Sequence, residues 1–71
     1  MFESFNAGSN YRLVLQPEAE GTYVFIFKRA DSRFPERDEL QDTVEIAKEC
    51  CLADFGTPLD SWRAFAGERI R

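Results

Sequence analysis

Two adjacent cysteines, Cys50 and Cys51, lie in the segment AKECCLADFG (47–56) and are the first residues to consider for chemistry. A thiolate can act as a nucleophile, a redox group or a metal ligand. A disulfide between neighbours would close a strained ring, and a helix points adjacent side chains about 100° apart. Zinc takes about four ligands, whereas the chain has no His and no other Cys. We therefore expect neither a disulfide nor a metal site here.

A reactive cysteine needs a lowered pKa, which a nearby His, a cation or a helix N-terminus provides. Both cysteines fall near the C-terminus of an expected helix, whose partial negative charge raises a thiol pKa. Glu49 and Asp54 flank them, and Lys48 is the nearest cation in the sequence. Packing is the favoured interpretation, with Cys51 buried on the apolar side of the helix and Cys50 at its margin.

Other catalytic patterns are missing from the sequence. Without His, the chain cannot form a Ser-His-Asp triad, and its four glycines are scattered rather than grouped in a phosphate-binding loop. Two carboxylate pairs, Asp38/Asp42 and Glu45/Glu49, could bind a divalent cation or transfer protons. On an exposed helix face such pairs are more typical of solubility and helix-dipole residues. We predict that the chain is not an enzyme and needs no cofactor.

The length and composition predict one small domain in a reducing compartment. With 71 residues, 44% of them hydrophobic and 14% aromatic, the chain can build a single modest core. No apolar run reaches the ~18 residues that a membrane span needs, and the start MFESFNAGSN has neither the basic nor the apolar region of a signal peptide. Two cysteines do not make a secreted disulfide framework. We expect a cytoplasmic protein that does not enter a membrane.

Alternating apolar residues predict a β-hairpin over residues 11–29. In YRLVLQ, Tyr11, Leu13 and Leu15 share one face, and TYVFIFKR is apolar on both faces. A strand that is apolar on both faces is usually covered on both. Residues 1–10 are rich in Ser, Asn and Gly, and we interpret them as a loose N-terminal arm. In the C-terminal segment, 57–71, Trp62 anchors the tail to the core, and WRAFA is either a third strand or a short helical turn.

The segment 35–55 has the spacing of an amphipathic helix. Its apolar residues recur at intervals of three or four and form a stripe: Leu40, Val44, Ala47, Cys51 and Phe55. Asp38 with Gln41, or Asp42 with Glu45, could cap its start, and Gly56 ends it. The sequence thus predicts an α+β domain in ββα order. An antiparallel β-hairpin, or in one alternative a three-stranded sheet, packs on one amphipathic helix, and a short Trp-anchored C-terminal segment follows.

The charge pattern predicts a surface for a basic protein partner. The net charge of −4 argues against bulk binding to nucleic acid or to anionic membranes. Acids gather in the expected helix, where Asp42, Glu45 and Glu49 lie near Ile46, an apolar residue off the stripe. We predict that these four residues bind another protein, so that the chain acts as a protein-binding or inhibitor module. If the second sheet face is left uncovered, the partner is instead a second copy in a homodimer.

A basic stretch supplies the alternative function. The segment KRADSRFPER (28–37) contains the cations Lys28, Arg29 and Arg33 and the aromatic Phe34. Cations combined with stacking aromatics are typical of surfaces that bind single-stranded nucleic acid. Because the neighbouring helix is acidic and RNA-binding signatures are missing, a nucleic-acid-binding accessory protein is the second hypothesis.

YRLVLQPEAEGTYVFIF, followed after a loop by DTVEIAKE, combines a hairpin with an acidic turn, a Gly before an aromatic residue, and a helix with a Thr-x-Glu-x-Ala start. In these features the segment from Tyr11 to Glu49 resembles the N-terminal domain of HicB-like antitoxins. The resemblance implies a ββα core in a partial RNase-H-like fold that inhibits a small basic RNA-cleaving toxin. RADSRFPERDELQ departs from the Pro-rich, Gly-Cys segment and Thr-x-Gly turn of the family, and the C-terminal DNA-binding segment is missing. No functional residue is carried over.

Overall fold

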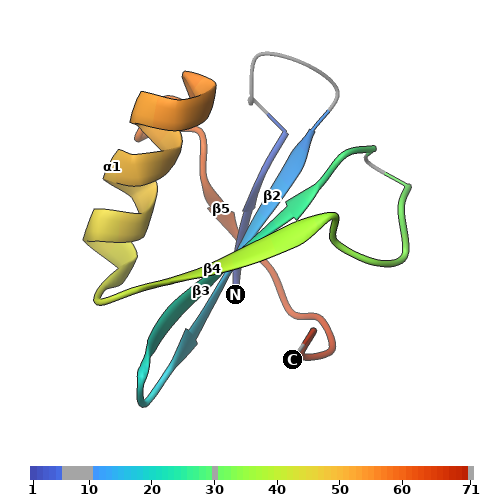
Figure 1. Cartoon of the computed structure of the whole chain (residues 1–71), viewed down its shortest axis with the longest axis horizontal. Helices are drawn as coiled ribbons and strands as arrows, with labels where there is room; N and C mark the ends of the chain where they lie inside the picture. Colours follow the sequence, from blue (N-terminus) through green and yellow to red (C-terminus); the bar gives the residue numbers. More distant parts are fainter. Residues whose placement is uncertain (6–10, 30, 71) are drawn as a thin grey trace.

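The computed structural model describes residues 1–5, 11–29 and 31–70. In these residues the fold is a five-stranded antiparallel sheet with one helix packed on it (Figure 1). Its elements are, in chain order, β1 (Phe2–Ser4), β2 (Arg12–Glu18), β3 (Gly21–Phe27), β4 (Arg37–Gln41), α1 (Val44–Phe55) and β5 (Arg63–Ala64). The strands lie in the order β4-β3-β2-β1-β5. The predicted ββα hairpin or three-stranded sheet is therefore wrong, because further strands extend the hairpin on both of its sides.

β2 and β3 form the predicted hairpin, and one of its faces packs on α1. The register places Leu13 opposite Ile26 and Leu15 opposite Val24. Directly opposed residues point to the same face of a sheet, so these four side chains form one apolar layer. Buried Ala47 and Cys51 of α1 complete this core, and partly buried side chains close its border: Phe2, Tyr11, Val44, Phe55 and Trp62.

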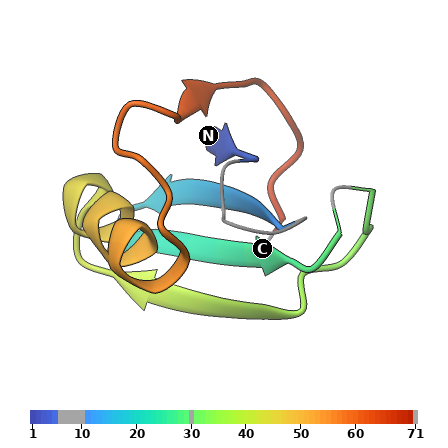
Figure 2. The same ribbon diagram turned by 90° about the horizontal axis from the view of Figure 1, so that it is seen from above.

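The opposite face of the hairpin is covered by residues 65–70, which we call the C-terminal strap. Buried Val14, Phe25 and Phe27 pack there against Met1, Tyr23, Phe65 and Ile70. The Ile70 N–H donates to Gln16 Oε1 at 2.7 Å, and Arg69 pairs with Glu18 at 2.8 Å. In both views, α1 and the chain that follows β5 lie on opposite sides of the strands (Figure 2). The second apolar face is thus covered within the chain, which removes the premise of a homodimer through that face.

The predicted loose arm over residues 1–10 is wrong for its first part, because Phe2–Ser4 form β1. β1 pairs with β2 on one side and with β5 on the other, so its backbone groups are bonded along both edges. Residues 6–10 of the expected arm lie outside the described residues.

The predicted helix over 35–55 is wrong for residues 35–43 and right for Val44–Phe55. Residues Arg37–Gln41 form the edge strand β4, which pairs with β3. The helix begins after Thr43, whose side-chain oxygen accepts a hydrogen bond from the Ile46 N–H at 3.1 Å. It ends at Gly56, which has the left-handed conformation, with φ 69°. Pairing with β3 satisfies the backbone groups of 37–41 that face β3 and overrides the helical periodicity that Leu40 had suggested.

The C-terminal segment contains a strand, β5, but it does not extend the hairpin directly. β5 pairs with β1, with Arg63 opposite Glu3 and Ala64 opposite Phe2. The expectation that Trp62 anchors this segment is confirmed, since its ring packs on the core between the sheet and α1.

Gly21 is the position where the fold most clearly requires glycine. Its φ is +145°, and a Cβ there would lie 2.5 Å from the backbone oxygen of Gln41 on β4. We expect Gly21→Ala to lower the free energy of unfolding by about 2 kcal/mol or more, measured by denaturant titration. Gly56→Ala is the matched control: its φ is also positive, but a Cβ there meets nothing within 4 Å, so we expect a loss of about 1 kcal/mol. Equal losses in the two variants would contradict the close approach of β4.

Candidate functional site

The structure confirms the packing interpretation of the two cysteines. Cys51 is 2% exposed and lies in the core beneath α1, while Cys50 is partly exposed at the margin. Burial is the main reason that the pKa of the Cys51 thiol is raised from 9.0 to about 12, and the nearby charges of Cys50, Glu39 and Asp54 contribute to the same increase. The nearest cation in the sequence, Lys48, instead stacks over the Phe2 ring, with Nζ 5.0 Å from its centre. The Cys51 thiol is therefore protonated near neutral pH.

The described part of the chain contains no set of side chains that could bind a metal ion. Within residues 1–5, 11–29 and 31–70, no group of three or more His, Cys, Asp or Glu residues is placed to hold a metal ion. Of the two carboxylate pairs considered from the sequence, Asp38/Asp42 is divided between elements, since Asp38 lies on β4 and Asp42 precedes α1, whereas Glu45/Glu49 lies within α1.

The predicted acidic site lies on the outward side of α1. Asp42 is in the turn before the helix, and Glu45, Ile46 and Glu49 are in its first two turns; all four are exposed. In the described residues, no ion pair engages any of the three carboxylates. Ile46 is 39% exposed, and Leu52, six residues further along α1, is 43% exposed. We call Asp42, Glu45, Ile46, Glu49 and Leu52 the outer helix face.

The outer helix face combines three exposed acidic side chains with two exposed apolar ones. At 100° per residue, its four helical members fall on the side of α1 away from Ala47 and Cys51, and Asp42 lies in the turn just before them. Acids near the start of a helix also complement the helix dipole, so their presence alone has a structural explanation. Ile46 and Leu52 are two of the six exposed large apolar side chains in the described residues, and their position beside the acids makes this face a candidate for a protein contact.

The alternative basic patch is partly neutralised by its own loop. Lys28 lies 3.7 Å from Glu36, and Arg29 lies 3.6 Å from Asp31. Arg33 makes no hydrogen bond or ion pair with any residue that the structure describes. Phe34 is 82% exposed and is the most exposed large apolar side chain among the described residues.

Two hollows that sequence analysis missed lie on the strap side of the sheet. The larger, about 560 Å³, lies between the β3–β4 loop and the C-terminal strap, and is lined by Phe25, residues 33–38 and residues 68–70. The smaller, about 230 Å³, is lined by Tyr23, Asp38, Glu39 and Leu40. Local sequence patterns give no signal for either hollow, because their walls come from segments that are far apart in the chain.

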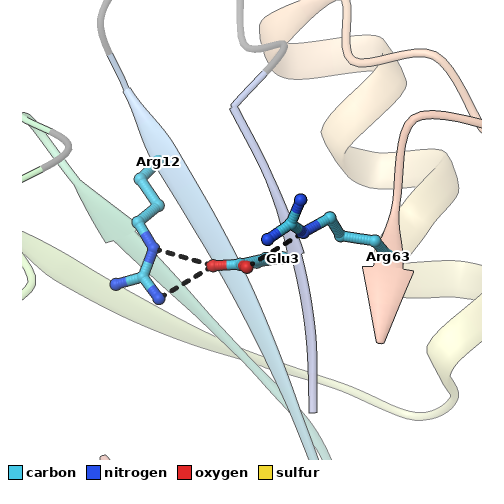
Figure 3. A network of polar contacts seen from close by, with 3 residues as sticks. All are labelled: Glu3, Arg12 and Arg63. Carbon is cyan, nitrogen blue, oxygen red and sulfur yellow. Dashed lines mark hydrogen bonds and ion pairs between the residues drawn. The ribbon is translucent and has the colours of Figure 1, made fainter. Parts of the chain in front are cut away.

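A buried carboxylate network also escaped the sequence analysis. Glu3, in β1, is buried, and its Oε1 accepts hydrogen bonds from Arg12 Nε at 3.2 Å and Arg12 Nη2 at 2.9 Å (Figure 3). Its Oε2 accepts from Arg63 Nε at 3.2 Å. The Arg12 guanidinium also lies 5.2 Å from the Phe27 ring centre and 5.5 Å from that of Phe65. Because both carboxylate oxygens are already bonded, the network holds strands together rather than presenting a reactive acid.

Comparisons with known proteins leave the site without a precedent. Neither protein-family models, nor curated proteins, nor solved structures gave a match to this chain. In the part of the chain that the structure describes, no helix has the length and apolar character needed to cross a membrane.

The buried state of Cys51 predicts a large difference in thiol reactivity. We expect Cys50→Ala, which leaves only Cys51, to react with iodoacetamide at pH 8 at least ~100-fold more slowly in the folded protein than in urea, because burial excludes the reagent and the pKa is raised. Cys51→Ala, which leaves only partly exposed Cys50, should show a much smaller ratio. Rapid alkylation of Cys51 in the folded protein would contradict the packing role.

Proposed function

We propose that this chain is a non-enzymatic cytoplasmic module that binds or inhibits another protein, using the outer helix face against a basic surface. The observation that carries the proposal is the combination of Asp42, Glu45 and Glu49, exposed and outside every ion pair of the described residues, with exposed Ile46 and Leu52. The apolar side chains would supply contact area, and the acids would steer a basic partner and exclude acidic ones.

The buried thiol supports the non-enzymatic part of this proposal. The residue type with the greatest intrinsic reactivity in this sequence is cysteine, and the pKa of Cys51 is raised to about 12. The resemblance to HicB-like antitoxins is compatible with the same proposal, because a small basic toxin is a partner that an acidic face fits. A homodimer is the weaker alternative, since Met1, Phe65 and Ile70 occupy the face that would have formed it.

The nucleic-acid hypothesis retains one specific observation in its favour. Phe34 is 82% exposed beside Arg33, and an aromatic next to a cation can stack a base and bind a phosphate. Glu36 and Asp31 lie in the same loop and pair with its other cations, which weakens attraction to a polyanion. Binding of single-stranded RNA by the wild type that Phe34→Ala and Arg33→Gln abolish would favour this hypothesis over the helix face.

Neutralising the outer helix face should remove partner binding selectively. We expect the variant Asp42→Asn/Glu45→Gln/Glu49→Gln to retain proteins from an extract of the producing cells roughly tenfold more weakly than the wild type. The matched control, Glu20→Gln/Asp54→Asn/Asp60→Asn, removes the same charge from exposed acids outside the outer helix face and should bind like the wild type. Wild-type binding should also weaken as salt rises.

Two outcomes would contradict the proposal. One is equal retention of the same proteins by the helix-face variant and the wild type. The other is equal loss in both variants, which would indicate an effect of net charge rather than of this face.

A further inference from the structure

The outer edge of β4 is a second feature that none of the functions considered so far uses. β4 pairs with β3 from Thr22–Gln41 to Ile26–Arg37, and the sheet order ends there. Among the residues that the structure describes, no strand pairs with its other edge. An unpaired edge presents a row of N–H and C=O groups to which an extended segment can add.

Both hollows of the strap side lie along this edge and meet at Asp38. The smaller one has Leu40 and Tyr23 in its wall, and the larger one has Phe34 and Phe25; Asp38 lines both. Leu40 is opposite Tyr23 in the register, and Tyr23 packs on the strap side, so Leu40 points to that side as well. The edge therefore adjoins two depressions with an exposed acid between them.

The spacing along β4 matches the side-chain period of an extended chain. Leu40 and Asp38 are two residues apart, so they share a face, and Leu40 is 49% exposed. A strand added to the edge would direct three alternate side chains toward the strap side. The first would lie beside the smaller hollow, the second opposite Asp38, and the third at the larger hollow near Phe34. Its backbone would complete the row of hydrogen bonds that β3 makes on the other side of β4.

We propose that β4 binds an extended segment of a partner protein, which adds as a further strand with the facing pattern apolar–basic–aromatic. An apolar side chain contacts Leu40 and Tyr23, a Lys or Arg lies opposite Asp38, and an aromatic enters the hollow beside Phe34. This surface does not depend on the outer helix face, because α1 packs on the opposite face of the sheet.

A second copy of the chain fits this edge less well than a basic segment. Full antiparallel overlap of two copies of β4 would place Glu39 opposite Glu39 of the other copy, and like charges directly opposite each other destabilise a strand pair. The charged residues of β4 also protect an edge from unselective pairing. A basic residue of the partner opposite Asp38 would replace this repulsion with attraction. The charges of β4 would therefore favour a basic partner over a second copy of the chain.

A designed peptide tests the inference on the full-length chain. The probe is a capped peptide of about seven residues with Ile, Lys and Phe at alternate positions, separated by Thr. Binding should shift the backbone amide resonances of β4 and slow their hydrogen exchange, with little change in α1 or β5. Two further peptides carry N-methyl groups on one or the other set of alternate amides. We expect one set to abolish binding and the other to leave it intact, because only one set donates to β4.

Charge reversal gives a matched control for the facing pattern. Asp38→Lys should weaken binding of the Lys peptide by up to about fivefold and strengthen binding of the same peptide with Glu in place of Lys. Asp60→Lys, at an exposed position outside the sheet, should change neither. Amide shifts confined to other elements, equal binding of both N-methylated peptides, or no shift at millimolar peptide would overturn the proposal. So would concentration-dependent changes in the β4 amides without peptide, which would assign the edge to self-association.

Discussion

The pairing of the buried Glu3 carboxylate with two arginines is the interaction on which the rest of the fold depends. It holds the strands that let α1 cover one face of the hairpin and the C-terminal strap cover the other. A buried charge is strongly unfavourable unless it is paired and hydrogen-bonded. Here the pairing comes from both neighbouring strands, with Arg12 on β2 and Arg63 on β5. Arg63 is directly opposite Glu3, and Arg12 is two residues before Val14, which is opposite Glu3 on the other side. Both arginines can therefore bond Glu3 when β1 lies between β2 and β5.

The position of the C-terminal strap depends on the position of β1. β5 leads directly into residues 65–70, and the Phe65 N–H donates to the Met1 carbonyl at 2.9 Å. Arg12 links the carboxylate to the strap, because its guanidinium bonds Glu3 and also lies near the rings of Phe27 and Phe65. With β1 and β5 fixed, the strap covers one face of the hairpin while α1 covers the other. Neither cover uses the outer helix face or the outer edge of β4.

The sequence predicted the elements whose signal is local. Alternation in YRLVLQ and TYVFIFKR was sufficient for the hairpin, and the positions of Ala47, Cys51 and Phe55 were sufficient for the buried side of α1, with Gly56 as its end. The same helical periodicity located the acidic residues on one exposed side. These predictions succeeded because each depends on spacing within one segment.

The other three strands have no such signal. β1 and β5 are three and two residues long, and β4 is charged at three of its five positions, Arg37, Asp38 and Glu39. Each exists because a neighbouring strand satisfies its backbone, which depends on residues far away in the chain. Leu40 continued the helical stripe by chance of spacing, and this moved the predicted start of the helix too early. The two hollows and the Glu3 network depend on these same strands, so they were missed with them.

Hydrogen exchange of Glu3→Gln, followed amide by amide, tests the central role of this carboxylate most directly. Gln keeps the size of the side chain and removes the charge that Arg12 and Arg63 share. We predict faster exchange in β1, β5 and the strap, with protection in β2, β3 and α1 close to that of the wild type. Unchanged exchange everywhere, or a uniform loss of protection across all elements, would contradict the claim that Glu3 fixes β1, β5 and the strap to the hairpin.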